Sequence, residues 1–319
     1  MDNWQSGSSL EGLKQRAELL AALRDFFRQR AVMEVDVPLL GRSSVTDINI
    51  ESISAVVSGN SGYLQTSPEY FLKRLLASGA GDIYCLGKAF RDGESGGRHN
   101  PEFTLLEWYR LGWDEHQLMD ELAELIQPLF VAQDKPMATV KMTYAEAFTS
   151  VLGLDPQDTA LVNLQELAVV HGSASWADES RSNCLDLLFS LCVEPQLPAG
   201  LVFIYDYPAC QSALAQIHSN DKGQLVSRRF EAFINGMELA NGYFELTDAV
   251  EQARRFASDV QQRAQAGQSE VPVDKHLLDA LEAGMPACAG VALGVDRLLM
   301  QLQSAGSIAE IMPFSWDRC

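Results

Sequence analysis

Two glutamates near a short turn could hold a metal ion. Asn235-Gly236 is the strongest short signal for a two-residue hairpin turn, so position 234 is expected to pair with 237, and 231 to lie opposite 240. In that register Glu231 and Glu238 are diagonal neighbours on one face. Like charges repel unless a cation lies between them, and magnesium held by two carboxylates and substrate phosphates is the natural occupant. The alternative is a solvent-exposed face rich in glutamate, which an acidic chain makes common.

Glu245 would share that face only if its strand is irregular. It lies seven residues beyond Glu238, an odd step that turns its side chain to the other face of a regular strand. A bulge at Asn241-Gly242 would return it to the face of the two glutamates.

An earlier hairpin carries side chains suited to a nucleotide. Strand alternation places Phe103, Glu107 and Tyr109 on one face, and Arg91 belongs to the partner strand. A guanidinium beside an aromatic ring can bind a phosphate while the ring stacks on a base. An amphipathic hairpin exposed to solvent explains the spacing equally well.

A third segment combines a strand, a glycine turn and a helix start, in Gly290-Val-Ala-Leu-Gly294-Val-Asp296-Arg297. Glycine allows close approach of a ligand, and the helix N-terminus together with Arg297 favours anions. The segment matches neither the dinucleotide fingerprint nor the P-loop, so both are rejected. The stretch Gly93–Gly97 has the form GxSxG, but it lies within a hairpin, whereas a nucleophile elbow joins a strand to a helix. We interpret that match as chance.

Hydrophobic periodicity predicts the elements that position these side chains. Helices are expected at about 8–30, from Ser67-Pro68-Glu69 to Gly79, over much of 115–190, at 248–265 and at 295–304; strands are expected at 83–91, 102–113, 230–234, 237–244 and 290–293. Ser67 is expected to be the N-cap of the second helix. Strands joined by hairpins indicate an antiparallel sheet with flanking helices, an α+β fold. We expect one domain over residues 1–319, with a helical insertion at about 115–190.

Composition limits the class of protein. The 319 residues include 24 basic and 43 acidic side chains, a net charge of −19, and 47% are hydrophobic, as in folded globular proteins. The sequence has no run of about 18 apolar residues and no secretory signal, and its cysteines are scattered, so a cytoplasmic protein with reduced thiols is expected. The acidity disfavours a protein that holds long nucleic acid by its phosphates. The histidines and cysteines form no metal-ligand set.

Together these segments resemble the three signature motifs of class II aminoacyl-tRNA synthetases. In chain order, the similar segments are Glu34-Val-Asp-Val-Pro38 for motif 1, Phe90 to Phe103 for motif 2, and Gly290 to Arg297 for motif 3. Similarity to the lysyl-tRNA synthetases of subclass IIb is carried by Thr66-Ser-Pro-Glu69, Arg98-His-Asn-Pro-Glu-Phe-Thr104 and Glu238-Leu-Ala-Asn241-Gly-x-x-Glu245-Leu. The resemblance begins at about residue 10. It implies the class II catalytic fold, ATP and magnesium as cofactors, and a homodimer through motif 1.

The resemblance also implies roles for single residues. Arg91 would bind the α-phosphate and Arg297 the outer phosphates, which makes these two the expected catalytic residues, and Phe103 would stack on adenine. The set expected around ATP is Arg91, Asp92, Gly93, His99, Asn100, Phe103, Glu238, Leu239, Gly294 and Arg297. Glu231 and Glu238 would bind magnesium.

The resemblance to lysyl-tRNA synthetases implies a substrate with two amino groups, and such a dicationic amino acid calls for an acidic pocket. The residues that the resemblance implies for it are Ser67, Pro68, Glu69, Tyr109, Asn241 and Glu245. Glu69 and Glu245 would meet the two amino groups, and Asn241 the carboxylate. Motif 2 usually reads Arg-x-Glu, whereas this chain has Arg91-Asp92-Gly93-Glu94, so Glu94 or Asp92 would have to replace one contact with adenine.

One absence separates the possible members of the family. A lysyl-tRNA synthetase has a large N-terminal domain that reads the anticodon, and here only a short leader and one helix precede motif 1. The chain more closely resembles stand-alone ligases of this family, which attach (R)-β-lysine to a lysine of elongation factor P. Elongation factor P is therefore the expected partner, and neither tRNA nor a membrane is. The alternatives are a truncated lysyl-tRNA synthetase that charges tRNA and a non-catalytic synthetase paralogue.

Overall fold

The computed structural model describes residues 4–319 and contains two compact units. The first unit consists of Met1–Trp113 together with Leu246–Cys319, and the second is Asp114–Glu245. The helical insertion predicted at about 115–190 falls within the second unit. A single domain over residues 1–319 stays a prediction.

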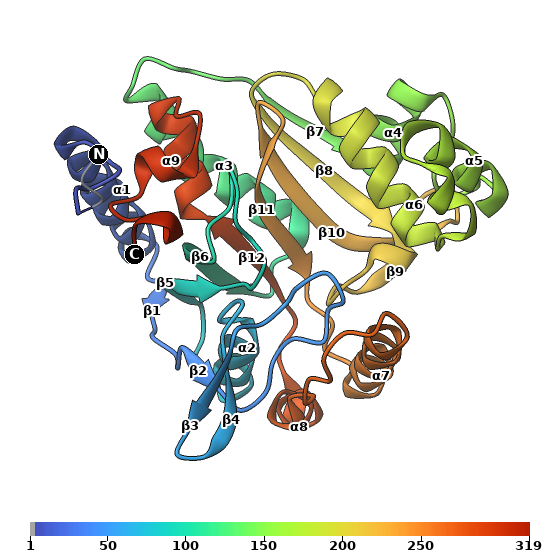
Figure 1. The fold of residues 1–319 in the computed structure, drawn as a ribbon, viewed down its shortest axis with the longest axis horizontal. Helices are drawn as coiled ribbons and strands as arrows, with labels where there is room; N and C mark the ends of the chain where they lie inside the picture. Colours follow the sequence, from blue (N-terminus) through green and yellow to red (C-terminus); the bar gives the residue numbers. More distant parts are fainter. Residues whose placement is uncertain (1–3) are drawn as a thin grey trace. The chain divides into compact units, whose positions relative to one another are not determined.

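Four strands in the order β1, β5, β6, β12 are the centre of the first unit (Figure 1). Their bounds are Met33–Glu34 (β1), Ile83–Phe90 (β5), Glu102–Leu111 (β6) and Cys288–Gly294 (β12). β6 is antiparallel to both β5 and β12, and β1 is parallel to β5. Helix α1 (Leu10–Gln29) packs on one face, because its Phe27 ring stacks on Tyr84 at 4.4 Å and meets Trp108 edge-on at 5.3 Å. Alternation therefore directs the odd-numbered residues of β6 to the opposite face.

The other elements of the first unit include a small sheet in the order β2, β4, β3. The bounds are Leu40–Gly41 (β2), Ser54–Val57 (β3), Asn60–Leu64 (β4), Glu69–Ala77 (α2), Ala249–Gln265 (α7), Lys275–Gly284 (α8), Val295–Gln303 (α9), Ile308–Ile311 (α10) and Trp316–Arg318 (η5). The predicted cap of α2 is wrong. Its N-cap is Pro68 and not Ser67, and no side chain makes a capping bond. Pro68 already has helical backbone angles, and its carbonyl accepts the N–H groups of Phe71 and Leu72.

The second unit has strands in the order β11, β10, β8, β7, with β9 paired to β10. The bounds are Thr139–Thr143 (β7), Leu201–Pro208 (β8), Ile217–Ser219 (β9), Leu225–Ile234 (β10), Met237–Phe244 (β11), Glu115–Val131 (α3), Tyr144–Leu152 (α4), Leu161–His171 (α5) and Arg181–Leu188 (α6), with short turns of other helix types at Ala174–Asp178 (η1), Phe189–Val193 (η2), Glu194–Gln196 (η3) and Ala209–Gln211 (η4). α4, α5 and α6 lie together in Figure 1. Their core includes packed aromatic rings: the Tyr144 ring stacks on Phe189 and packs against Tyr207.

The predicted class of fold agrees with these elements. Both hairpins lie where the sequence placed them, β5–β6 within two residues of the expected bounds, and β10–β11 around the Asn235-Gly236 turn. Strand pairs are mostly antiparallel and helices flank them, so the α+β prediction is confirmed. Of the helices within residues 4–319, none is both long enough and apolar enough to cross a membrane.

Candidate active site

In the first unit, the face of β6 that bears Phe103, Glu107 and Tyr109 has small neighbours. Phe103 lies beside Ala89, Leu105 between Gly87 and Gly294, Glu107 between Cys85 and Ala292, and Tyr109 between Ile83 and Gly290. Glu107 and Tyr109 are buried, whereas Phe103 and Gly87 are partly accessible. A Cβ on Gly87 would meet only the Cys85 sulfur, at 3.7 Å, so packing does not demand glycine there. We call this face the β6 trough, since glycine and alanine residues flank much of it.

Arg91 lies at the accessible end of the trough. Its guanidinium carbon is 5.1 Å from the centre of the Phe103 ring, as the hairpin geometry predicted. The guanidinium donates to the Thr66 carbonyl and to the Glu94 carboxylate, both at 3.4 Å. A guanidinium has five N–H donors, and two long contacts leave capacity for a phosphate. The confirmed contact is with Phe103; the contacts with ATP stay predictions.

The loop after Arg91 accounts for the glycine in motif 2. Gly93 has a φ of +74°, and a Cβ there would meet nothing within 4 Å, so the backbone conformation is what favours glycine. The Asp92 carboxylate accepts the Gly93 N–H at 2.9 Å, and Glu94 faces Arg91. Replacement of the missing adenine contact by either acid stays a prediction.

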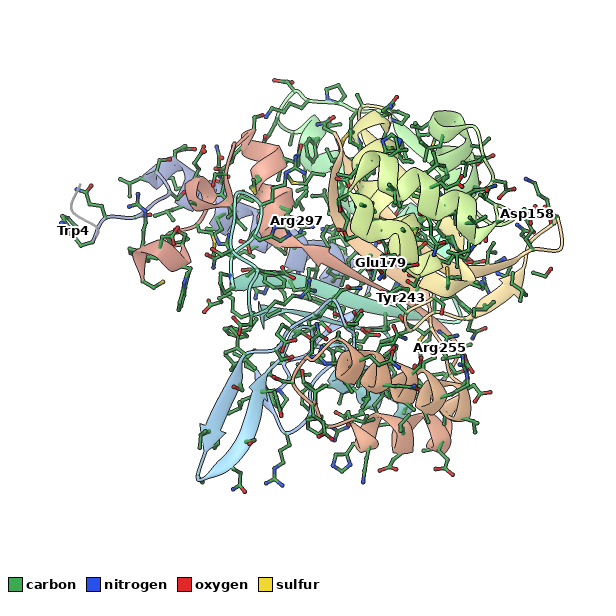
Figure 2. All side chains as sticks on the ribbon, turned by 45° about the vertical axis from the view of Figure 1, so that its right-hand side comes forward. Trp4, Asp158, Glu179, Tyr243, Arg255 and Arg297 are labelled. Atoms are coloured by element: carbon green, nitrogen blue, oxygen red, sulfur yellow. The ribbon has the colours of Figure 1, made fainter. Side chains whose placement is uncertain are left out.

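Arg297 and His99 come together at the helix start. Arg297 lies in the first turn of α9, whose N-cap is Gly294, and Figure 2 labels it there. Its Nη2 lies 2.6 Å from Nε2 of His99 in the motif 2 loop. Because the N-terminus of a helix also favours negative charge, this corner is suited to phosphates.

Asn100 has a structural environment. Its Nδ2 donates to the Glu102 carbonyl at 2.7 Å, and its Oδ1 accepts the Trp316 N–H at 2.8 Å. These bonds fasten the motif 2 loop to the last turn of the chain. These two bonds give Asn100 a structural role that requires no ligand, and its contact with ATP stays a prediction.

In the first unit, Glu69 and Tyr109, both predicted for the amino-acid pocket, make side-chain hydrogen bonds. Glu69 accepts a hydrogen bond from Lys73 Nζ at 2.7 Å, one turn further along α2, and Lys73 is only 1% exposed. A buried ammonium needs such a counterion, so Glu69 also has a structural role. Tyr109 donates to Glu107 Oε1 at 2.7 Å. Burial, followed by the charge of Glu107, raises the pKa of the neighbouring Cys85 to about 12, so this thiol stays protonated at neutral pH.

In the second unit, the predicted register of β10 and β11 is correct next to the turn and wrong beyond it. Phe233 pairs with Glu238 as predicted, but Glu231 lies opposite Asn241 and not opposite 240. The extra residue is Leu239, so the bulge lies there and not at Asn241-Gly242. The bulge still has the predicted consequence, because alternation beyond it returns Asn241, and with it Glu245, to the face of Glu238.

Glu231 is held by two donors that the sequence did not reveal. Arg229 Nη2 donates to Glu231 Oε1 at 2.5 Å, and the Tyr207 hydroxyl donates to Oε2 at 2.6 Å. Burial raises the pKa of Glu231 to about 7; Arg229 lowers it, the charge of Glu238 raises it, and the bond from Tyr207 lowers it. Arg229 was missed although it is two residues from Glu231 on one strand, a spacing that predicts a shared face. Nothing in the sequence pointed to Tyr207.

Two carboxylates that repel each other fit a divalent cation. Glu238 destabilises the ionised form of Glu231, and a cation between them would remove that repulsion. Two carboxylates, completed by the oxygens of substrate phosphates, suit magnesium. Within residues 4–319 no group of three or more His, Cys, Asp or Glu side chains is arranged to hold a metal ion. A magnesium ion held by Glu231 and Glu238 stays a prediction.

The remaining predicted residues of the second unit lie along β11, which also carries Tyr243 (Figure 2). Asn241 Oδ1 accepts a hydrogen bond from Arg229 Nε at 3.2 Å. Leu239, predicted to contact ATP, is buried at the bulge. Glu245 is 1% exposed, and its backbone carbonyl accepts from Gln216 Nε2 at 3.0 Å.

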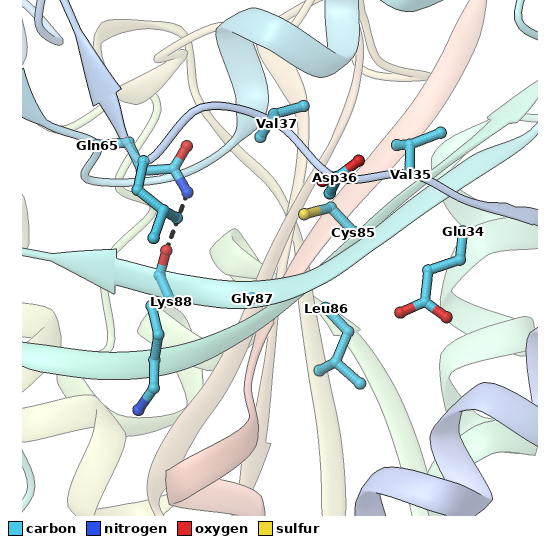
Figure 3. A pocket seen from close by; sticks show the side chains of 10 residues that line it. Glu34, Val35, Asp36, Val37, Gln65, Cys85, Leu86, Gly87 and Lys88 are labelled. Carbon is cyan, nitrogen blue, oxygen red and sulfur yellow. Dashed lines mark hydrogen bonds between the residues drawn. The ribbon is translucent and has the colours of Figure 1, made fainter.

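A pocket of about 490 Å³ lies in the first unit between the motif 1 segment and β5 (Figure 3). Its lining residues are Glu34, Val35, Asp36, Val37, Leu39, Gln65, Cys85, Leu86, Gly87 and Lys88. Gln65 Nε2 donates to the Lys88 carbonyl at 2.9 Å across it. Cys85 and Gly87 also flank the trough, but Arg91, Phe103 and Arg297 do not line the pocket.

Comparison with known proteins agrees with these features. The family model for class II tRNA synthetases (D, K and N) matches residues 3–318. Curated relatives named elongation factor P–(R)-β-lysine ligase match nearly the whole chain. The relative from Pseudoalteromonas translucida (strain TAC 125) is 48% identical, over 99% of this chain and 98% of its own. Those from Vibrio vulnificus (strain YJ016) and Edwardsiella ictaluri (strain 93-146) are 46% and 44% identical, over 98% and 100% of this chain and 98% and 99% of theirs.

The chain is therefore a class II tRNA synthetase-type protein, and the predicted fold family is confirmed. Within that class it belongs to the family of the elongation factor P–(R)-β-lysine ligases.

Proposed function

We propose that this protein activates (R)-β-lysine with ATP and transfers it to a lysine of elongation factor P. The observation that carries the proposal is identity of 43–48% to ligases of that name over 98–100% of the chain. The substrate carboxylate attacks the α-phosphorus of ATP, which forms an aminoacyl-adenylate and releases pyrophosphate. The lysine amine then attacks the adenylate carbonyl, which forms an amide and releases AMP and a proton.

The side chains of the first unit support the activation step. Arg91 and Phe103 would bind the α-phosphate and the adenine, and the Arg297–His99 corner would bind the outer phosphates. Because charge develops on phosphoryl oxygens, positioning and fixed cations supply most of the catalysis, and no nucleophilic side chain is needed.

In the second unit, Glu231 and Glu238 would hold magnesium, which supplies charge neutralisation to the phosphates when bound. Glu69, Glu245 and Asn241 would recognise the two amino groups and the carboxylate of the amino acid, with Ser67, Pro68 and Tyr109 lining its pocket. We place the enzyme in the cytoplasm as a homodimer. Half-exposed apolar side chains beside motif 1, namely Met33, Leu39 and Leu40, support a dimer interface at that segment.

The proposal is tested by incubating the protein with ATP, magnesium and either lysine isomer, in the presence of elongation factor P or lysine tRNA. We expect elongation factor P to gain the mass of one β-lysyl group, detected by intact-protein mass spectrometry, and replacement of its acceptor lysine by arginine to prevent the gain. Label that is transferred to tRNA alone would contradict the proposal and favour a tRNA-charging enzyme.

A further inference from the structure

Residues 43–51 form an irregular segment of the first unit, which we call the strap. It is held at several points by α7 and by the residues between α7 and α8. Thr46 Oγ1 donates to Asp259 of α7 at 2.8 Å, and Gln268 Nε2 donates to the Ile48 carbonyl at 2.9 Å. Ser43 Oγ donates to Asp274, the N-cap residue of α8, at 2.8 Å. The strap contains no helix or strand, so hydrogen bonds to neighbouring segments hold its conformation.

Arg263 of α7 makes the largest share of these contacts. Its Nη1 donates to the Asp47 carbonyl at 2.9 Å and to the Ile50 carbonyl at 3.3 Å. Its Nη2 donates to Glu51 Oε2 at 2.6 Å, and the arginine side chain is only 2% exposed. A planar guanidinium with fixed donors can satisfy these acceptors together, which a lysine cannot do. Arg263 therefore sets the backbone of the second half of the strap.

The end of the strap contacts the loop that carries Arg91. The Asp92 N–H donates to the Glu51 carbonyl at 2.8 Å, so the peptide group that follows Arg91 is held by the strap. The Arg91 N–H donates to the Pro101 carbonyl at 2.9 Å, within its own hairpin. The backbone around Arg91 thus has two anchors, and one of them depends on α7 through Glu51.

We propose that Arg263 is a positioning residue for activation by ATP: it fixes Glu51, which fixes the peptide group after Arg91 and so the place of the Arg91 guanidinium. This inference rests on the proposed use of Arg91 with ATP. Small displacements of a positioning group are costly, and a misplacement of about 1 Å can lower a rate about 10²-fold. Loss of one of the two anchors is expected to raise the KM for ATP about tenfold.

The test is Arg263→Gln in the full chain. The variant is assayed by ATP–pyrophosphate exchange with (R)-β-lysine, and by hydrogen exchange of the peptide that covers residues 88–98. We expect the higher KM for ATP, little change in the KM for the amino acid, and faster exchange at the Asp92 amide. Arg254→Gln is the matched control, since it makes the same change on the same helix, where Arg254 is 68% exposed and pairs with Glu251 one turn away. The control should match the wild type.

A folded Arg263→Gln protein with unchanged KM for ATP and unchanged exchange over residues 88–98 would overturn the proposal. If this variant does not fold, Glu51→Gln and Thr46→Val are used instead, since each removes one contact of the strap. Faster hydrogen exchange at the Asp92 amide in either variant supports the proposal. Unchanged exchange in both variants overturns it. Wild-type protein without pyrophosphate exchange would instead contradict the proposed function. The hydrogen-exchange result would still decide whether Arg263 holds the loop.

Discussion

The two units hold their functional charges in different ways. In the first unit, Arg91 lies just past the end of a strand and makes two contacts of 3.4 Å, so its donors are only loosely engaged. In the second unit, Glu231 is largely buried, and donors at 2.5 Å and 2.6 Å occupy both of its carboxylate oxygens. The first arrangement leaves capacity for an arriving anion, and the second fixes an acceptor in advance.

The contrast follows from the tasks that we propose. ATP must bind and pyrophosphate must leave in every turnover, so tight internal pairing of Arg91 would compete with the substrate. A metal-binding carboxylate benefits from outer contacts that fix its orientation, as Arg229 and Tyr207 do for Glu231. Glu231 is therefore rigidly held, whereas Arg91 keeps hydrogen-bond donors available for a ligand.

Glu238→Gln should give the largest effect on this comparison. It removes one of two proposed metal-binding carboxylates, so magnesium-dependent pyrophosphate exchange is expected to fall by at least about 10²-fold. The melting temperature, measured by circular dichroism, should change little, because Glu238 is partly accessible and glutamine keeps its shape.

Glu251→Gln is a suitable control for that prediction. It removes a carboxylate on α7, in the first unit, that pairs with Arg254 and Arg255. Pyrophosphate exchange should be unaffected. Exchange that survives in Glu238→Gln would show that the hairpin does not hold the metal.

The sequence predicted the features that depend on near neighbours. Asn235-Gly236 located the second hairpin, and the pairing expected in the first hairpin placed Arg91 beside Phe103. The position of the bulge was wrong for a reason that lies outside the hairpin. Leu239 at the bulge and Ala240 after it are both buried, at 3% and 1% exposure. A sequence pattern does not show which face of a hairpin will be covered.

Partners that are distant in the sequence were also missed. Tyr207 and Glu231 are 24 residues apart, and the buried Asp296, which binds Arg16 at 2.6 Å beside the start of α9, is 280 residues from that arginine. Their spacing carries no periodic signal, because tertiary packing alone brings them together. The support around a site is thus harder to predict than the residues that lie on one hairpin.

Gly87→Ala tests the free capacity of the first unit. The added methyl group meets only the Cys85 sulfur at 3.7 Å and alanine is the better residue for an ordered strand, so the melting temperature should be kept or slightly raised. If the β6 trough receives a ligand beside Leu105, the methyl group takes part of its space. We expect a rise of about tenfold in the KM for ATP or for the amino acid, measured by pyrophosphate exchange.

Gly96→Ala is the control for this change, because it makes the same substitution in the motif 2 loop, where a Cβ meets nothing within 4 Å. Wild-type constants in a stable Gly87→Ala protein would mean that the trough is not a binding surface. The comparison would then rest on Arg91 and Arg297 alone.

The smallest expected effect concerns the fixed charge of the second unit. Burial raises the pKa of Glu231 from 4.5 to about 7, so the folded protein binds this proton more tightly than the unfolded chain does. Stability falls with rising pH wherever the folded state binds more protons. The contribution of this group is present in full below pH 4.5 and is lost as the pH rises to about 7. The slope from one proton is at most about 1.4 kcal/mol per pH unit.

Urea unfolding at several pH values between 4.5 and 7, with a chelator present, measures that slope. Glu231→Gln cannot titrate and should flatten it. Glu251→Gln should leave it nearly unchanged, because Arg254 and Arg255 lower the pKa of Glu251 to about 2, outside this window. Magnesium should also reduce the loss of stability near pH 7, since a bound cation favours the ionised carboxylate. Equal slopes in the wild type and in Glu231→Gln would mean that Arg229 and Tyr207 keep Glu231 ionised throughout. The carboxylate of the second unit would then be ready for its cation at every pH tested, which would make its difference from the loosely held Arg91 larger.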